Sequence, residues 1–238
     1  IDGTNQPAIL ILPSRGRSDA TKKTPLVVNL HSWSADFNQR TPLEKLVPDQ
    51  GWIFLAPNFR GANSHPDACG SKLAQQDILD AVQWAVDRHH ADPDRVYLTG
   101  SSGGGHMTLL MVARHPHVWR AASAWVGISD LAAWHKRHRG SRYGNMLEAC
   151  CQGKPGDSIA VDEQYTARSP LTFLADAKEI PIDIAAGIKD GHQGSVPVAH
   201  SVWAFNAIAS ARGTMPVSQH ELKQISDAEG RLESPQPK

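Results

Sequence analysis

The sequence predicts an α/β fold, a three-layer sandwich in which a mostly parallel sheet lies between helices. Two observations support this prediction. Short apolar runs rich in β-branched residues alternate along the chain with segments of helical period. One of these runs leads into a serine flanked by glycines, at the point where a helix follows a strand. The length of 238 residues fits a single domain that spans residues 1–238.

Six runs have the length and composition of buried strands. We expect the first to lie at an edge of the sheet. Strands that alternate with helices favour a parallel sheet covered on both faces. In chain order, the predicted strands are Ala8–Leu12, Pro25–Leu30, Trp52–Ala56, Arg95–Thr99, Ala121–Val126 and Pro181–Ala186.

Three segments between these runs predict helices. The first carries apolar residues at helical spacing over 78–86, with Asp77 placed to cap its start. The second spans 103–115 and ends at a proline, and the third spans 196–212 and ends at a glycine. The stretch at about 130–169 breaks this rhythm with a basic run and a Gly/Pro-rich turn. We interpret it as an insertion above the sheet.

Composition excludes several classes of function. Lys plus Arg and Asp plus Glu both number 24, so the net charge is zero, which argues against a surface that holds nucleic acid or anionic lipid by charge. No apolar run reaches the ~20 residues of a membrane span. Because the chain begins at Ile1 without a signal segment, we expect a trimmed, soluble protein. The sequence does not determine the cellular location of the protein, and secreted and periplasmic locations are among the options.

The three cysteines are too few for a disulfide framework. Cys69 pairs with Cys150 or Cys151, or all three remain free buried thiols, and the sequence leaves this choice open. No CxxC or HExxH spacing occurs. We therefore expect neither a metal nor an organic cofactor.

The segment Thr99–Gly105 contains the pattern Gly-x-Ser-x-Gly with Ser102 at its centre. A serine on a sharp strand-to-helix turn projects its hydroxyl, and the helix N-terminus behind it offers free N–H groups to an oxyanion. A glycine-rich turn without chemistry and a phosphate-binding loop are the alternatives. The lack of a Walker lysine and of Gly-x-Gly-x-x-Gly spacing favours a nucleophile.

An acyl-transfer site needs two N–H donors for the oxyanion. Gly103, the residue after the nucleophile, supplies one. We expect Trp33 to supply the other, with Ser32 as the next candidate, because both follow the strand that ends at Leu30. The alternative is that Trp33 and the neighbouring His31 merely pack beneath this loop.

The acid is expected after a late strand. Asp190 is the first carboxylate past the strand at 181–186, at the edge where open α/β sheets place their ligands. It would orient a histidine and stabilise the cation of that histidine. A solvated loop aspartate is the alternative. Asp183 lies inside the strand and should occupy a covered face.

The base should follow the acid along the chain. His192 lies two residues from Asp190, His200 falls in the expected helix, and His220 lies in a polar segment. We take His192 as the first candidate and His220 as the alternative, and the sequence does not decide between them.

Several stretches match those of a known family in the same order. They are Leu30–Trp33, Asn58–Gly61, Asp77–Val82, Asp94–Gly105, Ala167–Leu171 and Gly187–Asp190 with Val196-Pro197. Through them the chain resembles the prolyl oligopeptidase-like branch of the α/β-hydrolase superfamily. The resemblance implies the α/β-hydrolase form of the three-layer sandwich, with Ser102 as nucleophile and Asp190 as its acid.

The chain also departs from that family. Ser32 follows His31 where members commonly have glycine, and two additional residues separate Asp190 from Val196. We expect no counterpart of the β-propeller of large oligopeptidases within these 238 residues. Members usually end with a further strand, a loop bearing the catalytic histidine and a closing helix. We expect the sequence to stop short of this unit, so that the true base lies beyond it.

Further residues are candidates for the rim of the site. His31, Asn58 and Arg60 would bind substrate above the sheet, although a structural role for Arg60 is an equal alternative. The basic run Lys136–Arg142 is expected to be a solvated face, and otherwise to contact an acidic substrate.

These inferences predict a serine hydrolase that cleaves small or carbohydrate-linked esters through an acyl-enzyme on Ser102. One alternative is a peptidase of the same family that acts on short peptides. The other is a non-catalytic binding module that kept the fold and lost the base. The expected partner is a small ester or short peptide, and the sequence does not fix an oligomeric state.

Overall fold

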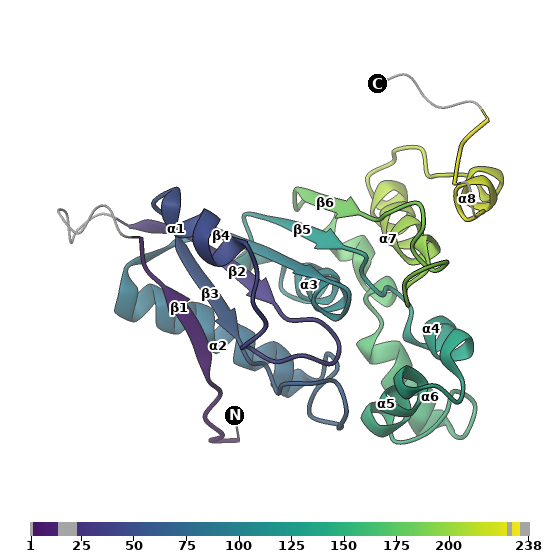
Figure 1. The fold of residues 1–238 in the computed structure, drawn as a ribbon, viewed down its shortest axis with the longest axis horizontal. Coiled ribbons are helices and arrows are strands. Elements are labelled where there is room, and N and C mark those ends of the chain that lie inside the picture. Colours follow the sequence, from purple (N-terminus) through teal and green to yellow (C-terminus); the bar gives the residue numbers. More distant parts are fainter. Residues whose placement is uncertain (1, 14–22, 228–229, 234–238) are drawn as a thin grey trace.

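The computed structural model describes residues 2–13, 23–227 and 230–233. Its centre is a six-stranded sheet with the order β1-β3-β2-β4-β5-β6 (Figure 1). β1 runs antiparallel to β3, and every other pairing in the sheet is parallel. The strands are β1 (Ala8–Ile11), β2 (Thr24–Leu30), β3 (Ile53–Pro57), β4 (Ala91–Ser101), β5 (Ala121–Trp125) and β6 (Ile182–Ala185). The predicted α/β fold and all six predicted strands are confirmed.

Three helices cover one face of the sheet, namely α2 (Lys72–His89), α3 (Gly103–Arg114) and α7 (Val198–Ala211). Alternate residues of the strands, such as Leu26 and Val28 of β2, pack with apolar residues of these helices in the main core. Full burial of one such side chain stabilises the fold by about 1.5–3 kcal/mol. This core therefore fixes the sheet that carries the candidate site.

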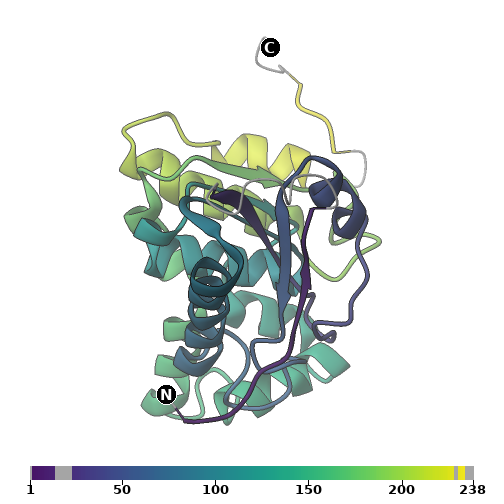
Figure 2. The same ribbon diagram turned by 90° about the vertical axis from the view of Figure 1, so that its left-hand side faces the viewer.

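The opposite face is covered unevenly. α1 (Leu43–Asp49) lies across the strands from α2 (Figure 2), and Val47 packs there against Val27 in a smaller core. Toward β5 and β6 this face is open to solvent in the described structure, where Trp125 is 52% exposed and Asp183 is also exposed. The expectation that Asp183 lies on a covered face is therefore wrong.

The start of α2 differs from the prediction. Ser71 is the N-cap, and its hydroxyl accepts a hydrogen bond from the N–H of Ala74 at 3.0 Å. Asp77, the predicted cap, lies inside the helix and binds Arg60. α3 and α7 agree closely with the predicted ranges, and α7 starts after Pro197.

The stretch expected to be an insertion forms three short helices, which lie together below α7 in Figure 1. A residue with a short polar side chain caps each of them, and a separate core lies between them. These helices were not predicted individually, nor was α8 (Gln219–Ile225) near the end. The three are α4 (Leu131–His138), α5 (Arg142–Cys151) and α6 (Ile159–Arg168).

The three cysteines meet in the core of the insertion. Cys69 packs with Cys150 and Cys151, and all three are buried free thiols. Burial raises the pKa of the Cys69 thiol and raises the pKa of Cys151 to about 12. Of the two alternatives left open by the sequence, the structure has the free thiols.

Among the helices of the described ranges, none is both long and apolar enough to cross a membrane.

His106 joins α3 to the end of the insertion. Its ring is fully buried, and its Nε2 lies 2.8 Å from the carbonyl oxygen of Arg168. Burial lowers the pKa of His106 to about 4, so the ring is neutral in the fold at neutral pH and Nε2–H donates. Burial also lowers the pKa of His200 in α7 to about 4.

These buried histidines predict acid sensitivity. Between pH 6.5 and 4 the unfolded chain binds protons that the folded chain does not, so the free energy of unfolding falls as the pH falls. His106→Gln should reduce this fall by about 3 kcal/mol, because one titrating group is removed. Urea unfolding at pH 7.5 and pH 4.5 measures the effect. His117→Gln, at an exposed position, is the matched control and should retain the wild-type pH dependence; an equal dependence in His106→Gln contradicts the account.

Candidate active site

Ser102 forms the turn between β4 and α3. Its backbone has φ 58° and ψ −116°, a conformation that costs a non-glycine residue about 1–3 kcal/mol. Two hydrogen bonds hold the turn: the N–H of Ser102 donates to the carbonyl oxygen of Trp125 at 2.9 Å, and its carbonyl oxygen accepts from the N–H of His106 at 2.8 Å. The side chain is half-buried. The turn thus presents the hydroxyl at the carboxyl end of the sheet.

Glycines let the first turn of α3 touch the loop after β2. A Cβ atom placed on Gly103 would lie 2.3 Å from the backbone nitrogen of Trp33, and one on Gly104 would lie 2.1 Å from the carbonyl oxygen of Leu30. Any side chain at either position would overlap backbone atoms. The peptide group that carries the Trp33 N–H therefore lies directly against the residue that follows Ser102.

The two N–H groups at this contact are available to a ligand. The N–H of Gly103 belongs to the first turn of a helix and has no intrahelical acceptor. Within the described residues, the N–H of Trp33 has no acceptor either. The N–H of Ser32, the other predicted donor, is engaged by Oε1 of Gln39 at 2.7 Å. Of the two candidates, the geometry favours Trp33.

Asp190 lies in a closed turn after β6. Its Oδ2 accepts a hydrogen bond from the N–H of Gly187 at 2.7 Å, and its own N–H donates to the carbonyl oxygen of Gly187 at 3.0 Å. The ends of β4, β5 and β6 are neighbours, because Ser102 bonds to the end of β5 and Val126 bonds to the end of β6. The strand of the acid is thus two strand spacings, roughly 10 Å, from the strand of the serine.

The histidines that follow Asp190 bind elsewhere. Nε2 of His192 lies 2.9 Å from the carbonyl oxygen of Ser226, and Nε2 of His220 lies 3.0 Å from Nε2 of Gln224. His200 is buried, and its Nδ1 lies 3.3 Å from the backbone nitrogen of Ser129. In the part of the chain that the structure describes, no histidine ring forms a hydrogen bond with the side chain of Ser102 or Asp190.

Two of the predicted substrate-binding residues face protein groups. His31 is buried and stacks on Phe59 with ring centroids 3.9 Å apart, and its Nε2 lies 2.6 Å from the carbonyl oxygen of Asn58. The side-chain amide of Asn58 donates to Oε1 of Gln6 at 2.9 Å. These contacts support the loop beneath the site.

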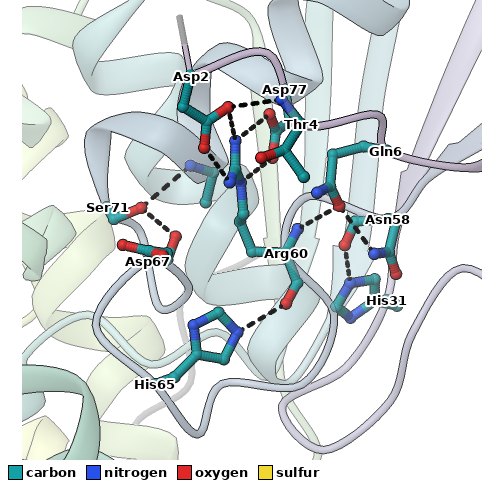
Figure 3. Close-up of polar contacts among 11 residues, drawn as sticks. Asp2, Thr4, Gln6, His31, Asn58, Arg60, His65, Asp67, Ser71 and Asp77 are labelled. Atoms are coloured by element: carbon teal, nitrogen blue, oxygen red, sulfur yellow. Dashed lines mark hydrogen bonds and ion pairs between the residues drawn. The ribbon is translucent and has the colours of Figure 1, made fainter.

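Arg60, the third, lies between two carboxylates (Figure 3). Its Nε lies 2.7 Å from Oδ2 of Asp77 on α2, and its Nη1 lies 2.6 Å from Oδ2 of Asp2. The side chain of Arg60 is only 7% exposed. Its hydrogen bonds hold the pKa of the Asp2 carboxyl well below the usual range. The guanidinium thus ties the N-terminal segment to α2, which favours the structural role for this residue.

Comparison with known proteins supports the same fold and shows the family of the chain. The profile described as "Prolyl oligopeptidase family" matches residues 39–217, three quarters of the chain. The chain belongs to this family.

Among the described residues, no three or more His, Cys, Asp or Glu side chains gather in a cluster that could hold a metal ion.

Curated relatives of the chain include peptidases and esterases. It is 30% identical over 201 residues to prolyl oligopeptidase A of Galerina marginata, covering 76% of this chain and 27% of that protein. It is 29% identical over 185 residues to dipeptidyl aminopeptidase BIII of Pseudoxanthomonas mexicana, covering 74% and 26%. With acetylxylan esterase A of Emericella nidulans it shares 27% identity over 164 residues, covering 66% and 47%. The chain thus spans a quarter to a half of the length of these relatives.

Solved structures match the fold. An acylaminoacyl peptidase of Pyrococcus horikoshii superposes with a TM-score of 0.69 at 19% identity, covering 90% of this chain and 34% of that chain. The fold is therefore that of the α/β hydrolases.

The ion pairs of Arg60 yield a prediction about stability. Arg60→Met should lower the free energy of unfolding by about 1–3 kcal/mol, because it leaves the nearly buried Asp77 carboxylate without its partner. Lys45→Met removes a solvent-exposed pair with Asp49 and should cost less than about 1 kcal/mol. Urea unfolding at pH 7.5 compares the two variants. Equal stabilities would show that Arg60 does not hold the N-terminal segment.

Proposed function

We propose that the protein is a serine hydrolase that forms an acyl-enzyme on Ser102. The observation that carries this proposal is the strained turn at Ser102, which lies beside two N–H groups that are available to a ligand. A backbone conformation of this cost persists only where the surrounding structure enforces it, and such positions cluster at active sites. Membership of the prolyl oligopeptidase family supports the same chemistry.

The proposed reaction has two halves. Oγ of Ser102 attacks the carbonyl carbon of the substrate while a histidine accepts the hydroxyl proton. The N–H groups of Gly103 and Trp33 stabilise the oxyanion of the tetrahedral intermediate, and the leaving group takes the proton as it departs. Water then attacks the acyl carbonyl carbon while the histidine accepts a proton from it. The bond to Oγ of Ser102 breaks, Oγ takes that proton from the histidine, and the carboxylic acid departs. Loss of one oxyanion donor typically costs about 10²–10³-fold in rate.

Asp190 is the proposed acid, and a histidine must bridge it to Ser102. The carboxylate would hold the imidazole in the correct tautomer and stabilise its cation. The two strand spacings between their strands leave room for one ring between the side chains. His192 stays the first candidate and His220 the second, and each must leave its contact with Ser226 or Gln224 to reach the serine.

We propose an ester rather than a peptide as substrate. The chain covers 47% of acetylxylan esterase A and 40% of two relatives named feruloyl esterase B, against 26–27% of the two peptidases. The name of the acetylxylan esterase favours a small ester linked to a carbohydrate. A peptidase acting on short peptides is the second candidate, favoured by the family and by its peptidase relatives. Hydrolysis of p-nitrophenyl acetate against aminoacyl anilides separates the two.

The first prediction concerns the nucleophile. A fluorophosphonate probe should label the wild-type protein at Ser102, because only an activated serine reacts rapidly. Ser102→Ala should abolish labelling and lower the turnover of p-nitrophenyl acetate by about 10³-fold or more. Ser101→Ala changes the adjacent exposed serine and should retain both. A folded wild-type protein without any labelling would instead indicate a binding module that kept only the fold.

The second prediction concerns the acid. Asp190→Asn should lower kcat by about 10²–10⁴-fold, because a neutral amide does not stabilise an imidazolium. Asp183→Asn is the matched control: this exposed carboxylate on β6 bonds to Ser123 and should be dispensable. Equal kcat values for the two variants would exclude Asp190 as the acid.

The same kinetic comparison applied to His192→Ala and His220→Ala identifies the base. If the kcat of one variant falls as far as that of Asp190→Asn, the histidine replaced in that variant is the base. If both retain wild-type kcat, neither of these in-chain candidates is the base.

A further inference from the structure

Three polar side chains on one face of α4 bind the loop that carries Asp190. Nε1 of Trp134 donates to the carbonyl oxygen of Ser195 at 2.9 Å, and Nε2 of His138 lies 2.7 Å from the same oxygen. The guanidinium of Arg137 donates to the carbonyl oxygen of Gly191. Part of the basic run therefore also contacts the acid loop (residues 186–197). Arg137 is exposed, as expected, whereas His138 is half-buried against this loop, so the expectation of a solvated face is wrong for His138.

Trp134 also contacts the loop after β2 (residues 31–34), which carries the proposed oxyanion donor Trp33 and is hereafter the oxyanion loop. Its ring meets that of Trp33 edge to face, with centroids 4.7 Å apart and an interplanar angle of 66°. Trp134 is fully buried, Trp33 is 2% exposed, and both share one core with Val196 at the end of the acid loop. The indole of Trp134 therefore contacts Trp33, the proposed oxyanion donor, with its ring, and Ser195 in the loop of Asp190 with its N–H.

We propose that Trp134 is a positioning residue that fixes the oxyanion loop and the acid loop relative to each other. The proposal rests on the proposed function, because it assigns a purpose to a side chain that is not among the proposed reacting or oxyanion-binding groups. The N–H of Trp134 sets the position of the chain that follows Asp190. Its ring edge keeps Trp33 pressed against Gly103.

The geometry explains why one residue serves both loops. The loop after β2 and the loop after β6 leave strands separated by β4 and β5, so the sheet alone does not join them. Trp134 of α4 contacts both loops and so supplies a link that the sheet lacks. A displacement of about 1 Å in a catalytic constellation costs up to 10²-fold in rate, so a rigid link of this kind has a kinetic consequence.

The experiment uses the full chain with two substitutions of Trp134. Trp134→Phe removes the N–H and retains a ring against Trp33, and it should lower kcat for p-nitrophenyl acetate about tenfold with KM changed less than about twofold. Trp134→Ala removes both contacts and should lower kcat about 100-fold, with an equal slowing of fluorophosphonate labelling. His138→Phe removes the second donor to Ser195 at a half-buried position and should lower kcat in the same direction.

Trp119→Phe is the matched control. Trp119 is also buried, and its Nε1 donates to the carbonyl oxygen of Met111 at 3.2 Å, at the other end of α3. It should lose thermal stability as Trp134→Phe does and keep wild-type kcat. Rates are measured well below the unfolding temperature and normalised to phosphonate-titrated protein, so that a loss of folded molecules does not count as a loss of turnover.

The pH profile gives a readout that a structural role would not move. A displaced acid stabilises the imidazolium less, so the ascending limb of kcat/KM should shift to lower pH in Trp134→Phe and stay in place in Trp119→Phe. Wild-type kcat and an unshifted limb in Trp134→Phe and His138→Phe would overturn the inference. Failure of the proposed function is distinguishable, because the wild-type protein itself would then be unlabelled and inactive.

Discussion

The site depends on how closely the first turn of α3 approaches the backbone of the sheet. Side chains at Gly103 and Gly104 would overlap the backbone at Trp33 and Leu30, so the helix reaches this position only with hydrogen atoms there. That contact places the N–H of Trp33 beside the N–H of Gly103. It also forces Ser102 into a turn with positive φ, which lifts the hydroxyl above the sheet. Fold and chemistry thus share one steric constraint.

The insertion extends this constraint to the rest of the site. Its core buries Trp134 against Trp33, and its helix α4 holds the loop that carries Asp190 through backbone carbonyl oxygens. His106 and Arg168 join the other end of the insertion to α3. The insertion is therefore packed on α3 at one end and on the loop that carries Asp190 at the other, which makes it part of the scaffold.

The sequence predicted the sheet well because buried strands leave a local pattern. Short apolar runs between turn residues marked all six strands within a few residues, and the glycines around Ser102 marked the turn. Long-range contacts left no such pattern. Asp77 has the chemistry of a cap but binds Arg60 across the fold, and His138 belongs to a basic run but is half-buried against the loop that carries Asp190. The base stays a prediction, since the partners of a histidine depend on loops that the local sequence does not position. The N-caps Ser141 and Ser158 were the available signals for α5 and α6.

A crystal structure of the fluorophosphonate adduct tests the central claim most directly. If Ser102 is the nucleophile beside a preformed oxyanion site, the phosphorus is bonded to its Oγ. The phosphoryl oxygen then lies about 2.7–3.1 Å from the backbone nitrogens of both Gly103 and Trp33. A phosphoryl oxygen directed away from these two nitrogens, or a phosphonate bonded to another residue, would contradict the account.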